Sequence, residues 1–160
     1  MRRTAVVVCG LGIVLLCALY SPPVGAYETL AGRVKLTTRT PFASFATALQ
    51  QAIAHHKMGL VCHANAQAGA ATLGQTIPGN QVLMLYRPDF AIRMLHANVE
   101  VGFEAPVRLY IYENPDGTAT LIYIKPSTIF TPYKNAQLDQ MAAELDSVLE
   151  AIVQEAMTAP

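Results

Sequence analysis

Two alternating segments around an Asn-Pro-Asp-Gly sequence constrain the fold of this chain most strongly. Residues 106–113 and 118–125 alternate apolar and polar side chains, and residues 114–117 are of the types preferred in tight turns. This pattern predicts a β-hairpin with one buried face. The segment at 81–86 (QVLMLY) is almost continuously apolar, which predicts a further strand buried on both faces.

The turn position assigns each hairpin side chain to a face of the sheet. A fold at Pro115-Asp116 places Tyr112 opposite Ala119 and directs one set of apolar side chains inward: Val107, Leu109, Ile111, Ile122 and Ile124. The other face then holds Arg108, Tyr110, Tyr112, Leu121, Tyr123 and Lys125. Tyrosines beside cations are enriched at protein interfaces. The sequence therefore predicts a binding or dimer interface with four candidate residues, Arg108, Tyr110, Tyr112 and Tyr123. A bare aromatic face, or one covered by the C-terminal segment, is the alternative.

Proline, glycine and hydroxyl residues divide the rest of the chain into further elements. The expected elements are a strand at 29–37, a helix from Thr40-Pro41 to Gly59, strands at 60–65 and 81–86, a helix from Pro88 to about 98–102, the hairpin, and a helix at 135–157. The order is β-α-β-β-α-β-β-α. It predicts an α+β fold with a mainly antiparallel sheet of about five strands and helices packed on one face.

The first 26 residues have the three parts of a secretion signal. Arg2 and Arg3 precede an apolar run at 4–20, and Val24-Gly25-Ala26 is a small-residue cleavage site. The run is shorter than the ~20 residues of a membrane span, which favours a cleaved signal over a retained anchor. We expect cleavage near Ala26, a single domain at 27–160, no stable membrane span, and a periplasmic or secreted location.

Loss of this leader changes the charge and the cysteine count. The whole chain has 11 Lys and Arg against 11 Asp and Glu, so without Arg2 and Arg3 the formal charge is about −2. That balance argues against a nucleic-acid partner, because such affinity comes largely from a basic surface. Cys9 and Cys17 also leave, so Cys62 stands alone and a hydrophobic core must stabilise the fold.

Several short motifs together resemble a known family. They are the apolar strand VLMLY with Arg87-Pro88, a ten-residue helix, the segment 102–108 (GFEAPVR), the alternating strands with their Asp116-Gly117 turn, Lys125-Pro126-Ser127, and a first helix at 42–59. Through this combination of motifs, the chain resembles the domain of unknown function 302 family. The resemblance implies a small α+β fold with a curved antiparallel sheet and homodimers, and it implies no established activity. Arg87 replaces the usual helix-capping Asn, and Asn65-Ala66 replaces a usual acidic–histidine pair, so no function resting on that pair is carried over.

The histidines and the cysteine are the candidate metal ligands. Periplasmic proteins use such residues for copper or haem, but the chain has no C-x-x-C-H and no H-E-x-x-H motif. Cys62 and His63 are neighbours on a strand and should point to opposite faces, while His55 and His56 lie about 100° apart on their helix. The sequence therefore gives only weak metal candidates, His56, Cys62, His63 and His96, and favours ordinary surface histidines.

No residue pattern predicts a catalytic site. Nothing in the sequence places a cation or a helix N-terminus beside Cys62 to activate it as a nucleophile, and the chain has no G-x-S-x-G or phosphate-binding loop. We therefore expect an exported, homodimeric binding or interaction domain with an unknown small-molecule or protein partner rather than an enzyme. The alternative is a periplasmic metal- or haem-binding protein associated with redox metabolism, with copper or haem as its cofactor. A small-molecule enzyme, with Cys62 or a histidine beside a charged partner in a closed pocket, is the third interpretation.

Overall fold

The structure is a computed structural model that describes residues 32–159. The predicted signal at 1–26 lies outside the described residues. Within the described range, the elements follow one another as β1 (Arg33–Pro41), α1 (Phe42–His55), β2 (Gly59–Asn65), α2 (Ala66–Thr72), β3 (Asn80–Tyr86), α3 (Pro88–Ala97), η1 (Val99–Glu104), β4 (Val107–Glu113), β5 (Thr118–Ile124), α4 (Pro126–Phe130), η2 (Thr131–Tyr133) and α5 (Ala136–Thr158). This is the predicted order with short helices added, α2 and α4 among them.

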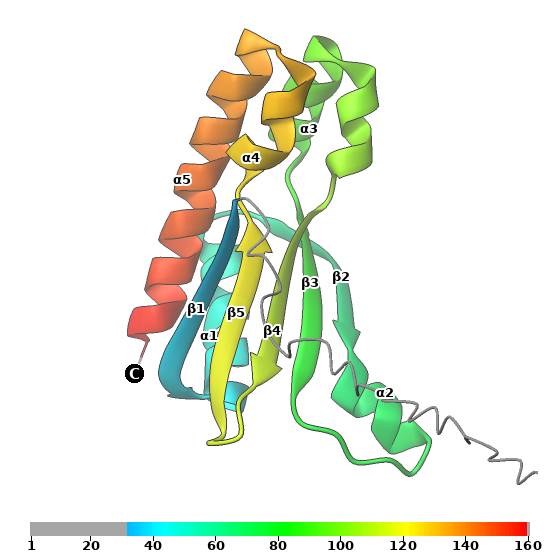
Figure 1. The fold of residues 1–160 in the computed structure, drawn as a ribbon, viewed down its shortest axis with the longest axis vertical. Coiled ribbons are helices and arrows are strands. Elements are labelled where there is room, and N and C mark those ends of the chain that lie inside the picture. The colour runs from blue at the N-terminus through cyan, green and yellow to red at the C-terminus, as the bar shows by residue number, and fades with distance from the viewer. Residues whose placement is uncertain (1–31, 160) are drawn as a thin grey trace, which may run out of the picture.

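The five strands form one open antiparallel sheet in the order β1-β5-β4-β3-β2. Figure 1 shows α1 and α5 on the same side of this sheet, with α3 and α4 near the end where β3 and β5 finish. The predicted α+β class, the antiparallel sheet and the helices on one face are confirmed. The strands β1 and β2 are the two edges, so the hairpin of β4 and β5 lies inside the sheet.

The core fills the space between the sheet and its helices. Leu83, Leu109 and Leu121 from three adjacent strands are all completely buried, as are Leu49 of α1 and Leu149 of α5. Burial of one such side chain stabilises the folded state by roughly 1.5–3 kcal/mol. The helix predicted at 135–157 is confirmed as α5, and its apolar stripe is buried over its length: Leu138, Met141, Leu145, Leu149, Ile152 and Val153.

The predicted pairing of the hairpin is wrong by one residue. Tyr112 pairs with Thr120, not with Ala119, and Leu109 pairs with Tyr123. The turn is longer than expected because the Asn114 amide donates to the Thr118 carbonyl at 2.8 Å and Gly117 adopts a left-handed φ of 80°. This is the geometry of a turn closed by a glycine bulge. A shift of one residue moves every side chain of β5 to the other face of the sheet.

The boundary between the first strand and the first helix also differs from the prediction. The sequence predicts Thr40 as the helix cap, but β1 continues to Pro41, which occupies the cap position without a side-chain hydrogen bond. The first helical amide, that of Phe42, instead donates to the Gly117 carbonyl at 3.0 Å. A partner distant in sequence thus satisfies this helix end, which local capping rules cannot anticipate.

The outward surface of α3 is more apolar than expected. On this helix Met94 is buried, whereas the next residue, Leu95, is 43% exposed. Further apolar side chains are exposed along α3 and η1, namely Ile92, Val99 and Phe103. We call these four residues the tip patch. As for membrane insertion, none of the helices within residues 32–159 has both the length and the hydropathy that a span requires.

Candidate functional site

The side of the sheet opposite the core is the main candidate surface. We call it the outer face. None of the helices among residues 32–159 lies across it (Figure 1). Because Leu83 and Leu109 point into the core, their strand neighbours point outward; Val82, Met84 and Tyr110 are half-buried and Arg108 is exposed. The apolar centre of the outer face consists of Val82, Met84, Tyr110, Tyr112, Ile122 and Ile124.

The strand register arranges this centre in rows across the sheet. Tyr110 lies between Val82 of β3 and Ile122 of β5. The rings of Tyr110 and Tyr112 are 5.7 Å apart between centroids, and the Asn80 amide nitrogen donates to the Tyr110 hydroxyl at 2.6 Å. The two rings are therefore held in place before any partner arrives.

Cations border the outer face. Arg108 lies opposite Met84 and is exposed, and the edge strand β1 adds the exposed side chains of Arg33 and Lys35. None of the outward positions of the five described strands carries an acidic residue. The surface thus combines an aromatic and aliphatic centre with a basic rim.

Three of the four predicted interface residues share the outer face, and the fourth does not. Arg108, Tyr110 and Tyr112 lie there together. Tyr123 is predicted beside them, but it is only 4% exposed on the core face, because the longer turn reverses the orientation of β5. Leu121, also predicted to face outward, is completely buried, whereas Ile122 takes the outward place.

The contribution of β3 was missed because its sequence predicts a fully buried strand. Leu83 and Leu85 are indeed buried, but Val82 and Met84 remain half-exposed on the outer face. A strand apolar on both sides is the signal that could have revealed this surface, since only one of those sides meets the helices.

Tyr123 instead borders a groove between the edge of the sheet and α5. The groove has a volume of about 580 Å³, and its lining mixes apolar side chains, including Val34, Leu36 and Val153, with polar ones such as Gln154. Burial, followed by the nearby Glu150 carboxylate, raises the pKa of the Tyr123 phenol. The phenol therefore stays neutral at physiological pH. Lys125 and Glu150, which also line the groove, form an ion pair at 2.7 Å.

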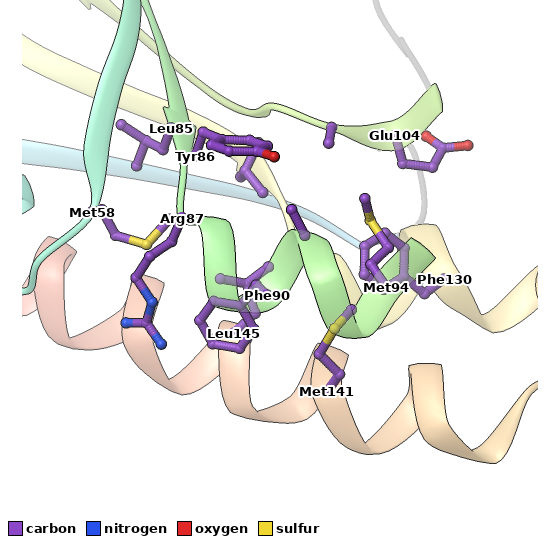
Figure 2. Close-up of a pocket in the computed structure, with 13 residues that line it drawn as sticks. Met58, Leu85, Tyr86, Arg87, Phe90, Met94, Glu104, Phe130, Met141 and Leu145 are labelled. Atoms are coloured by element: carbon purple, nitrogen blue, oxygen red, sulfur yellow. The ribbon is translucent and has the colours of Figure 1, made fainter. Parts of the chain in front are cut away.

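A second cavity lies between α3, α5 and the sheet, and Figure 2 shows its lining side chains. Its volume is about 40 Å³, room for about one water molecule and far below the several hundred Å³ of typical ligand pockets. Arg87 stands at its border, with its guanidinium 4.2 Å from the centre of the Phe90 ring and bonded to Asp89 at 2.7 and 3.0 Å. As predicted, Arg87 does not cap α3 with its side chain.

Three of the predicted metal candidates belong to no cluster of possible metal ligands within residues 32–159. Cys62 is exposed on the edge strand β2, and the next residue, His63, bonds through Nε2 to the Gln81 side-chain oxygen at 2.8 Å. Their register partners, Met84 and Leu83, lie on opposite faces, as the alternation of the strand predicts. His96 is exposed on α3.

The fourth candidate, His56, lies close to His55, although the spacing of a regular helix predicts that the two rings point in different directions. His56 is the C-cap of α1, with φ −80° and ψ 13°, so its backbone no longer follows the helix. Both rings contact Glu155 of α5: His55 Nδ1 at 2.9 Å and His56 Nε2 at 3.0 Å from the same carboxylate oxygen. The hydrogen bond from His55, and then that from His56, lowers the pKa of the Glu155 carboxyl. The carboxylate was missed because it lies 100 residues from His55.

Comparisons with known proteins agree with this fold. The family model described as "Domain of unknown function DUF302" matches residues 34–156. A crystal structure of an uncharacterized conserved DUF302 protein from Bacillus stearothermophilus is similar, with a TM-score of 0.68 and 19% sequence identity over 79% of this chain and 98% of that one. The search of curated proteins found no match. The chain therefore belongs to the DUF302 family of domains of unknown function.

Proposed function

We propose that this chain is an exported interaction domain that forms homodimers through its outer face. The observation that carries the proposal is the half-exposed apolar centre of that face, which no helix within residues 32–159 covers. Large contiguous apolar patches are uncommon on monomeric proteins and commonly mark interaction sites. A second copy of the chain is the occupant we assign to it.

The chemistry of the outer face matches the anatomy of protein interfaces. Its centre holds Tyr110 and Tyr112 among aliphatic side chains, and its border holds Arg108. Tyrosine, methionine and arginine are enriched in interfaces, while acidic residues are depleted. Long cationic side chains at the border can cover apolar surface while their charges stay in water, so the basic rim does not oppose the pairing of two copies.

The size of the face is adequate for a dimer. Five strands about 4.8 Å apart, each rising about 3.3 Å per residue over some seven residues, give a face of about 24 by 23 Å. Its projected area of about 550 Å² is of the same order as the ~800 Å² that each partner contributes to a standard interface. Two such faces packed sheet on sheet would enclose a second core about 10 Å thick.

The sequence of β3 supports the same occupant. Residues 81–86 are apolar on both sides of the strand, which is typical of strands with two covered faces. In the single chain, only the side of Leu83 and Leu85 packs on helices. Dimerisation would bury Val82 and Met84 as well, and the strand would then have the environment that its composition predicts.

The export part of the proposal is supported by the sequence of residues 1–26. Basic residues, an apolar run and a small-residue cleavage site occur there in the order of a secretion signal. Expression in a bacterial host followed by mass measurement of the periplasmic protein tests this part. The mass of a chain whose first residue is Tyr27 supports export, and an uncleaved chain confined to the cytoplasm contradicts it.

The dimer is tested by the molar mass in solution of the chain from Tyr27 onward. Light scattering coupled to size exclusion should give twice the chain mass for the native sequence. Tyr110→Lys with Tyr112→Lys should give monomers, since two ammonium groups would have to be buried at the centre of the interface. Phe103→Lys is the matched control, because Phe103 is 89% exposed in the tip patch.

Each outcome of this test decides the proposal. A native monomer at all concentrations contradicts the homodimer. A dimer that survives the two tyrosine changes but dissociates with Phe103→Lys would place the interface at the tip patch and refute the outer face. Circular dichroism of each variant shows whether the fold is retained, so a loss of folding is not mistaken for a loss of association.

A further inference from the structure

Two imidazoles and one carboxylate converge between the C-terminal ends of α1 and α5. His55 is the last residue of α1, His56 is its cap, and Glu155 lies in the last turn of α5. Among residues 32–159, these three form the one group in which at least three possible metal-donor atoms of His, Cys, Asp or Glu lie within 4.8 Å of one another. The cluster lies in the helix layer and shares no residue with the outer face.

The donor atoms are spaced as a metal ion requires. His55 Nδ1 and His56 Nε2 lie 2.9 and 3.0 Å from one Glu155 oxygen. With metal–nitrogen bonds of about 2.0–2.1 Å, adjacent ligands lie about 2.8–3.0 Å apart around an octahedral ion and about 3.3–3.4 Å apart around a tetrahedral one. An ion can therefore replace the hydrogen-bonding protons with small side-chain adjustments.

The surroundings also suit a cation. The end of a helix that exposes free carbonyl groups carries partial negative charge, and both histidines lie at such an end of α1. The His55 side chain is 75% exposed and that of Glu155 is 41% exposed, so an ion can enter from solvent and keep water in its remaining positions. His56 is the most buried member at 29% exposure, which restricts its ring orientation.

We propose that His55, His56 and Glu155 form a binding site for one divalent transition-metal ion that links α1 to α5. Two imidazoles with one carboxylate suit Zn²⁺, Ni²⁺ and Cu²⁺, and the general order of affinity for such nitrogen and oxygen sites places Cu²⁺ first. The open positions make the ion accessible to a further ligand from solution. The competing account is that the three side chains only form hydrogen bonds between the two helices.

If an ion links the two helices, its binding can be measured through the thermal stability of the chain, without any assay of activity. An ion that binds the folded chain and not the unfolded one raises the thermal midpoint. At a free metal concentration 100 times the Kd, the expected rise for a domain of this size is about 10 °C. A purely hydrogen-bonded cluster predicts no such rise.

The experiment uses the chain from Tyr27 onward, purified without a histidine tag and treated with a chelator. Titration calorimetry with Zn²⁺ and with Cu²⁺ should show one site, tighter for Cu²⁺.

Glu155→Gln and His56→Ala should each weaken binding at least tenfold and abolish the thermal shift. His96→Ala is the matched control for an exposed histidine, and Cys62→Ser removes the one thiol that lies between Tyr27 and the last residue; neither should change the binding. Electron paramagnetic resonance of the Cu²⁺ form should show two nitrogen ligands.

Two results would overturn the proposal. One is the absence of binding of either metal to the native chain. The other is one-site binding that persists unchanged in the double variant His55→Ala/His56→Ala, which would locate the metal elsewhere. Glu155→Gln keeps the size of the side chain and changes only its charge, so it decides between the two accounts even if the double variant does not fold.

Discussion

Tyr123 lies directly opposite Leu109 in the pairing of β4 with β5, and both side chains are buried beneath the helices. This pairing determines the composition of the outer face, because it sends Ile122 and Ile124 outward beside Tyr110. The pairing expected from a two-residue turn would have exposed Tyr123 and Leu121 instead. One residue in the turn therefore changes the outer face from a mainly tyrosine surface to a mixed aromatic and aliphatic one.

This register predicts different effects for two neighbouring residues of β5. Leu121 is completely buried, so Leu121→Ala should lower the free energy of unfolding by about 2–5 kcal/mol through lost burial and a cavity. Ile122 is half-buried on the outer face, so Ile122→Ala should cost about 1 kcal/mol or less in the single chain. Urea unfolding at a concentration where the chain is monomeric measures both. A larger loss of stability for Ile122→Ala than for Leu121→Ala would contradict this register and support the two-residue turn.

The turn itself is tested by a pair of glycine substitutions. Gly117 has a φ of 80°, and a Cβ added there would meet no atom within 4 Å, so Gly117→Ala should cost about 1–2 kcal/mol through backbone strain alone. Gly69 lies inside α2 with equally open space and without a positive φ. Gly69→Ala should therefore leave stability unchanged or raise it by up to about 1 kcal/mol. Equal effects of the two changes would contradict the bulged turn.

The turn should also depend on pH through Asp116. Its carboxylate accepts hydrogen bonds from the Thr118 hydroxyl at 2.6 Å and from the Thr118 amide at 3.1 Å, which lower the pKa of the carboxyl below its ordinary value. A carboxyl with a lowered pKa in the folded state stabilises the fold at pH values above its unfolded pKa. The stability difference between the native chain and Asp116→Ala should therefore be full above about pH 4 and shrink as the pH falls further.

Denaturant unfolding at several pH values on both sides of the ordinary aspartate pKa measures this difference. Thr118→Val serves as the control, because it removes the hydroxyl donor and leaves the carboxylate. In that background the same Asp116→Ala change should have a smaller effect at neutral pH. A difference that grows as the pH falls would contradict the assigned hydrogen bonds.

Much of the fold could be predicted because it depends on local patterns. The alternation in β4 and β5, the apolar run of β3 and the helical stripe of α5 are each visible within one segment. The order of these segments then favours an antiparallel sheet with helices on one face. These are the features that the structure confirms.

Two of the misses share a physical cause, which is contact between distant residues. The start of α1 depends on the Gly117 carbonyl, which accepts from Phe42. The histidine cluster depends on the approach of Glu155 from the other end of the chain. The third miss is local: the turn has three residues and a left-handed Gly117 where a two-residue turn is expected. Because this reverses β5, only three of the four candidate interface residues were assigned to the correct face.

Contacts between copies at the outer face are the central claim, and isotope-filtered nuclear Overhauser measurements detect them most directly. A mixed sample pairs chains carrying labelled Val and Ile methyl groups with unlabelled chains. The account predicts intermolecular signals from the methyl groups of Val82 and Ile122 to the rings of Tyr110 and Tyr112. Intermolecular signals confined to other residues, or none at concentrations where the native chain should be dimeric, would contradict it.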